Sequence, residues 1–102
     1  MADMIVVYWR DIPAQVIVRA GRSTAKRQLS SRFQEAIDLA AMRAGAIGTD
    51  AYLNDWRRSE PTPCGDDLEA EADAAQARIE REFDDAQIAG LVKGYGHDKA
   101  AD

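Results

Sequence analysis

The stretch from Ile5 to Arg27 limits the fold of this chain more than any other. It contains two runs rich in β-branched and aromatic residues, Met4–Arg10 and Gln15–Arg19, which is the composition of strands. Between them, Asp11 can hydrogen-bond the turn backbone and Pro13 fixes its own φ. The stretch therefore predicts a β-hairpin with a loop of about four residues.

Side chains alternate between the two faces of a strand, so the hairpin residues divide into two sets. The set expected to face the core is Ile5, Val7, Trp9, Val16 and Val18. The set expected to face outward is Tyr8, Arg10, Gln15, Ile17 and Arg19.

A long amphipathic helix is expected after the hairpin. Gly21 permits a change of direction, and Ser23 or Thr24 can cap a helix over residues 25–44. Its apolar positions recur every four residues and form one stripe, namely Leu29, Phe33, Ile37, Ala40 and Ala44. Gly45 suits the position that ends a helix.

Three further segments follow. Thr49 is expected to cap a short helix over residues 50–58 with Leu53 turned inward, and the prolines and glycine of residues 59–65 break the chain. An acidic helix then begins at Asp66, with Glu69 three residues later as in a capping box. Its apolar stripe runs to Ala86, and a final short helix carries Ile88, Leu91 and Val92.

These elements indicate an α+β fold, in which an N-terminal two-stranded β-hairpin packs on three to four α-helices. A chain of 102 residues is long enough for one modest core. We expect a single domain over residues 3–93 and a flexible C-terminal tail over residues 94–102.

Charge and composition exclude several classes of function. The net charge of −5 argues against a general binder of nucleic acid or of anionic membranes. No apolar run has the length of a membrane span, and no signal peptide is recognisable, so we expect a cytoplasmic protein. With one cysteine, Cys64, and one histidine, His97, we expect no catalytic residues, metal site or cofactor.

The charges are distributed unevenly along the chain. Residues 1–45 hold seven basic and four acidic residues, whereas residues 59–102 hold four basic and twelve acidic residues. The basic front is therefore expected to face either the acidic rear or an anionic partner.

The start of the expected helix is the candidate anion site. Helix-start N–H groups, hydroxyls and basic side chains together can hold a phosphate, sulfate or carboxylate. The candidate residues are Gly21, Arg22, Ser23, Thr24, Lys26 and Arg27. The alternative is that these basic side chains pair with the acidic helix.

The hairpin is the candidate interaction surface. Two strands alone are marginally stable in water and both are edges, so the hairpin can pair with another protein or with a second copy of the chain. The candidate partner-binding residues are Tyr8, Arg10, Ile17 and Arg19.

Three strings resemble a bacterial domain family called "virulence factor", which is also attached to a conserved virulence protein of Gram-positive bacteria. They are VYWRDIPAQVIV, RFQEAIDLAAMRAG and TDAYLNDWRR, within residues 4–58. The resemblance implies no reaction, cofactor or active-site residue. Stand-alone members of the family accompany genes for one-carbon and corrinoid methyl transfer. The resemblance therefore implies an accessory subunit.

From the residues and the resemblance we predict a non-enzymatic interaction or accessory module. The alternative is an accessory subunit of a metabolic enzyme that binds an anionic or phosphorylated ligand at Gly21–Arg27.

Overall fold

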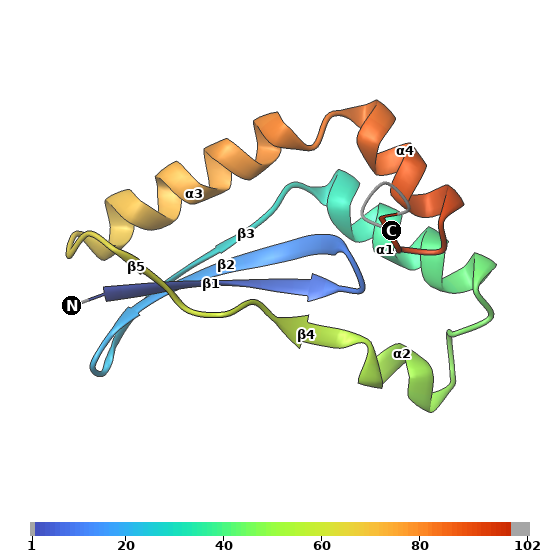
Figure 1. The fold of residues 1–102 in the computed structure, drawn as a ribbon, viewed down its shortest axis with the longest axis horizontal. Coiled ribbons are helices and arrows are strands. Elements are labelled where there is room, and N and C mark those ends of the chain that lie inside the picture. The colour runs from blue at the N-terminus through green and yellow to red at the C-terminus, as the bar shows by residue number, and fades with distance from the viewer. Residues whose placement is uncertain (1, 99–102) are drawn as a thin grey trace.

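The computed structural model describes residues 2–98, and its centre is an antiparallel sheet of five strands (Figure 1). The α+β class is confirmed, and four helices accompany the sheet within the described residues. In chain order the elements are β1 (Ala2–Trp9), β2 (Ile12–Ala20), β3 (Ser23–Gln28), α1 (Ser31–Arg43), α2 (Asp50–Asn54), β4 (Trp56–Arg58), β5 (Thr62–Cys64), α3 (Leu68–Glu82) and α4 (Asp85–Lys93).

The two predicted strands pair with each other, but three further strands extend the sheet. Its order is β3-β2-β1-β4, and β5 pairs with the other end of β1. The predicted hairpin is therefore one part of a larger sheet. The composition did not predict the short strands β4 and β5. Residues 56–58 were expected to end a helix, and residues 59–65 were expected to form a break that contains prolines.

The hairpin turn is tighter than predicted, which changes the register. β1 ends at Trp9 and β2 begins at Ile12, and a bulge lies between Val7 and Tyr8. Val6 lies opposite Val16, and Ile5 lies opposite Ile17. Because facing residues share a face of the sheet, the predicted core-facing set mixes residues from two faces.

The predicted helix over residues 25–44 is wrong over its first six residues. Residues 23–28 form β3, which pairs along β2 from Gln15 to Ala20, so neither Ser23 nor Thr24 caps a helix. Helix α1 begins at Ser31, and Phe33, Ile37 and Ala40 of the predicted stripe are buried in it. Leu29 is buried before the helix begins, and Ala44 is exposed. Gly45, with φ of +68°, follows the helix end as predicted.

The predicted helix over residues 50–58 also ends early. Helix α2 stops at Asn54 because Trp56–Arg58 pair with β1 as β4. Leu53, expected to point inward, is 69% exposed. The acidic helix is capped by Asp67 and not by Asp66, and its predicted stripe is divided between α3 and α4.

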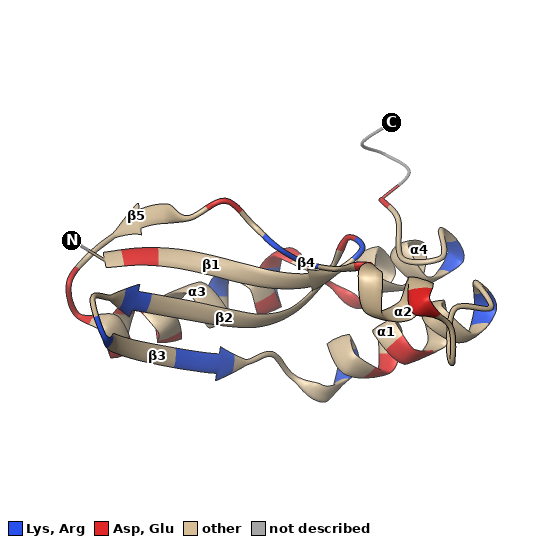
Figure 2. Cartoon of the chain, turned by 90° about the horizontal axis from the view of Figure 1, so that it is seen from below, with Lys and Arg blue, Asp and Glu red and all other residues tan. Residues whose placement is uncertain are grey.

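The helices cover one face of the sheet and one of its ends. Helix α3 contacts β2 and β3, while α1 contacts β2 and packs against α4. Seen from below, strands β1 to β3 lie in front of α3, and no described helix covers them on that side (Figure 2). The largest fully buried side chains are those of Trp9, Phe33, Ile12, Ile37, Val16, Val18 and Pro13.

The residues after α4 close the hairpin turn. The Asp11 amide donates to the Gly96 carbonyl, and the Arg10 guanidinium donates to the Tyr95 carbonyl. Gly96 lies so close to Trp9 that a Cβ atom would come within 2.8 Å of the indole ring. This part of the predicted tail thus contacts the hairpin, and residues 99–102 of it lie outside the described residues.

A carboxylate from α3 completes the start of α1. The Ser30 amide and hydroxyl both donate to Glu80, at 2.7 and 2.8 Å, and Arg32 pairs with the same carboxylate at 3.1 Å. Partial burial acts to raise the pKa of Glu80, but the bonds from Ser30 and Arg32 outweigh it and lower that pKa below its usual value.

We expect Glu80→Gln to make stability less dependent on pH. A lowered carboxyl pKa stabilises the fold above the pKa of the unfolded chain, and this stabilisation is lost as pH falls through the folded value. The variant should be less stable than wild type by about 1 kcal/mol at neutral pH, and the difference should shrink in acid. Urea unfolding across the acidic range measures this, with exposed Glu35→Gln as control. A difference that stays constant with pH would contradict it.

Candidate functional site

Arg27, one of the predicted anion-binding residues, is engaged within the protein. Its side chain pairs with Asp73 at 2.7 Å and with Glu69, both on α3. Hydrogen bonds to Glu69 and Asp73 raise the pKa of Arg27 further. For this residue the basic front does pair with the acidic rear, as the alternative interpretation predicted.

The other predicted anion-binding residues do not surround a helix start. Gly21 and Arg22 form the turn between β2 and β3, where Gly21 has φ of +58°. Ser23, Thr24 and Lys26 lie in β3. The helix-start N–H groups on which that prediction depended are therefore absent from this segment, and anion binding by these residues stays a prediction.

The predicted partner-binding residues do not share one surface. Arg10 has φ of +54° in the hairpin turn, pairs with Asp55 at 2.9 Å and is only 15% exposed in its side chain. Tyr8 lies on the helix-covered side of the sheet, beside Arg57. Ile17 and Arg19, which alternate with Val16 and Val18, project from the opposite side.

We call that opposite side of the sheet the open face. The register places its residues in three rows across the strands. These rows are Arg58, Val7, Gln15 and Gln28; then Ile5, Ile17 and Lys26; then Pro63, Asp3, Arg19 and Thr24.

Cations dominate the exposed part of the open face. Ile17 is only 7% exposed, so it offers little apolar surface, whereas Arg19, Lys26 and Arg58 are exposed. None of these three cations forms an ion pair within residues 2–98. The face therefore presents positive charge that the protein does not neutralise by contact.

The outer edge of β3 borders the open face. In the part of the chain that the structure describes, β3 pairs only with β2. Two of its carbonyls, those of Lys26 and Gln28, accept hydrogen bonds from the side chains of Arg27 and Gln76, so a further strand that pairs along the whole edge would displace these two bonds. The amphipathic pattern predicts a helix from residue 25, so it does not reveal this edge.

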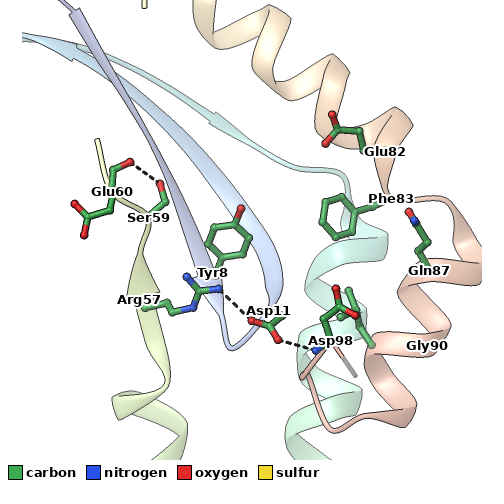
Figure 3. Close-up of a pocket in the computed structure, with 11 residues that line it drawn as sticks. Tyr8, Asp11, Arg57, Ser59, Glu60, Glu82, Phe83, Gln87, Gly90 and Asp98 are labelled. Atoms are coloured by element: carbon green, nitrogen blue, oxygen red, sulfur yellow. Dashed lines mark hydrogen bonds and ion pairs between the residues drawn. The ribbon is translucent and has the colours of Figure 1, made fainter. Parts of the chain in front are cut away.

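A cavity of about 810 Å³ lies on the covered side of the sheet, away from the open face. It is bounded by Tyr8 of β1, by the chain after β4, and by the corner where α3 meets α4 (Figure 3). Tyr8, Phe83 and Leu91 supply apolar surface. The sequence analysis did not find this cavity, because its walls come from segments far apart in the chain.

Charged side chains border the cavity. Arg57 lies over the Tyr8 ring with its guanidinium carbon 4.4 Å from the ring centroid, donates to the Arg10 carbonyl and pairs with Asp11 at 3.2 Å. Glu60 and Glu82 extend from opposite sides (Figure 3). Arg57 is thus already engaged by the protein.

Gly90 leaves one wall of the cavity without a side chain. It lies within α4, and a Cβ atom added there would meet nothing within 4 Å. Glycine inside a helix costs about 1 kcal/mol relative to alanine. Packing within this chain therefore gives no reason for glycine at this position.

Other candidate chemistry is sparse among residues 2–98. No group of three or more His, Cys, Asp or Glu residues there could hold a metal ion. Burial, with smaller contributions from nearby carboxylates, raises the pKa of the Cys64 thiol and so reduces its reactive thiolate form. No helix of the described chain is both long and apolar enough to cross a membrane.

The fold and its surfaces define a small α+β domain with one uncovered sheet face. Comparison with family models matches residues 7–92 to the family described as "Virulence factor", and the chain belongs to this family. No curated protein and no solved structure matches the chain.

We expect Gly90→Ala to stabilise the protein by about 0.5–1 kcal/mol, because alanine loses less backbone entropy in a helix and meets no neighbour here. Urea or thermal unfolding measures the change. Gly96→Ala is the matched comparison, and it should destabilise, because its Cβ would collide with Trp9. A loss of stability for Gly90→Ala would show that the space beside Gly90 is not open, and would contradict the prediction.

Proposed function

We propose that the protein is a non-enzymatic interaction module that binds an extended, acidic segment of a partner protein along β3 and over the open face. The observation that carries the proposal is the combination of a β3 edge on which no described strand pairs with exposed cations that have no ion-pair partner among the described residues. The proposed setting is the cytoplasm, where the lone Cys64 would remain a free thiol.

The edge of β3 supports an extended partner. An added strand satisfies the outward N–H and C=O groups of an edge, and alternate side chains of that strand then lie over each face. On the open face they would meet Thr24, Lys26 and Gln28, which are all polar. The recognition expected here is therefore by backbone pairing together with charge, and little apolar burial is needed.

The charge of the open face supports an acidic partner. The open face carries three cations and one carboxylate. The cations are Arg19, Lys26 and Arg58, and the carboxylate is Asp3. The chain as a whole is acidic, with net charge −5, so a long polyanion would be repelled by the rest of the surface. A short acidic segment that contacts only this face avoids that repulsion.

The same charges disfavour a second copy of the chain on this edge. Two β3 strands paired across a two-fold axis would bring equivalent basic residues, including Lys26, close to each other. Like charges on facing strands are destabilising, and lysine on an edge strand is a common protection against self-pairing. We therefore favour a different protein over the homodimer.

The alternative function, an accessory subunit that binds an anionic metabolite at Gly21–Arg27, has less support. It required a helix start at these residues, and they form a turn and a strand instead. Arg27 is also held by Glu69 and Asp73.

A synthetic peptide of alternating glutamate and valine tests the proposal, with a lysine–valine peptide as the charge control. Titration followed by amide chemical shifts should move β3 and the open face for the acidic peptide only. Arg19→Glu with Lys26→Glu should weaken binding by about tenfold or more, and salt should weaken it in wild type.

The matched control is Arg43→Glu with Lys93→Glu, which makes the same charge change at exposed helix ends and should leave affinity unchanged. Thermal unfolding of all variants checks that they remain folded. Equal binding of the two peptides, or shifts confined to other elements, would refute the proposal.

A further inference from the structure

We infer that the cavity between β1 and the α3–α4 corner binds a small organic cation that carries an apolar, preferably aromatic, body. This site lies on the covered side of the sheet and does not depend on the partner surface of the open face. Nothing in the family description assigns it.

The cavity has the size and walls of a small-molecule site. Its volume of about 810 Å³ lies within the range typical of ligand pockets. Tyr8 and Phe83 bring aromatic surface from a strand and from the end of α3, and Leu91 adds aliphatic surface from α4. An apolar body placed among these side chains would be removed from water on several sides.

Gly90 gives the second observation that points to a ligand. The open space around its Cα is part of the cavity, and no neighbour would collide with a side chain there. Gly90 is exposed, so the α4 backbone itself borders the cavity at this point. A flat ring could approach the helix at this point.

The charges of the cavity select the sign of the ligand. Arg57 pairs with Asp11 and donates to the Arg10 carbonyl, so this cation already has partners in the protein. Glu60 has no ion pair in the described chain, and the nearest cation to Glu82 is Arg78 at 3.8 Å. A protonated amine can therefore pair with either glutamate, whereas a carboxylate or phosphate would be repelled.

Three probes of similar size and different charge test the inference. These are 2-phenylethylamine, 2-phenylethanol and 3-phenylpropionate, each titrated into the full chain with amide chemical shifts as the readout. The amine should bind saturably with a Kd below about 10 mM and shift Ser59, Gly90 and Leu91. The alcohol should bind more weakly, and the acid should not bind at the cavity.

Two variants separate the contributions of shape and charge. Gly90→Leu should occupy the space beside α4 and reduce amine affinity at least about tenfold, while the Tm stays equal or rises. Ala89→Leu, on the neighbouring exposed position of α4, should leave affinity unchanged. The double variant Glu60→Gln/Glu82→Gln should lose the preference for the amine over the alcohol. The control double variant Glu35→Gln/Asp66→Asn, which removes two charges elsewhere, should keep that preference.

The inference is overturned if the amine gives no saturable shifts, or if Gly90→Leu binds it as well as wild type does. It is also overturned if the amine and the acid bind equally, because charge would then select nothing. Binding by 2-phenylethylamine that maps to the open face would assign the cation to another site. None of these outcomes bears on the acidic peptide, which is tested at β3.

Discussion

The register between β1 and β2 is the constraint on which the rest of the structure depends. A tight turn at Arg10 and Asp11 sets it, and contacts from Asp55, Tyr95 and Gly96 hold that turn. Because a shift of one residue exchanges the two faces of a strand, this turn decides which side chains meet the helices. With Val16 and Val18 beneath α3 and α1, the cations of the neighbouring positions are left on the open face.

The acidic rear of the chain neutralises only part of the basic front. Helix α3 pairs with Arg27 and Arg32, and its Glu80 also completes the start of α1. These contacts lie on the covered side of the sheet, so α3 does not reach Arg19 or Lys26. The same arrangement leaves two surfaces of opposite character, a cationic open face and a cavity bordered by glutamates.

Local patterns predicted the main helices and the hairpin partners but not the sheet. The stripe of α1 and the separate Ile88–Val92 turn could be read from spacing alone. Residues 23–28 could not, because STAKRQ carries no strand composition, and only pairing with β2 makes it extended. The uneven charge distribution allowed for pairing of Arg27 with the acidic helix. It gave no sign that Arg27 lies in a strand. The cavity was beyond prediction, since Tyr8, Phe83 and Gly90 meet only in the folded chain.

Cross-strand backbone NOEs in the native protein test the register most directly. The structure predicts NOEs that link Met4 with Val18, Ile5 with Ile17, and Val6 with Val16. NOEs that link Val7 with Val18 and Trp9 with Val16 would instead fit a four-residue loop. That result would place Tyr8 and Val6, instead of Ile5 and Asp3, opposite Ile17 and Arg19, and would contradict the account of the open face.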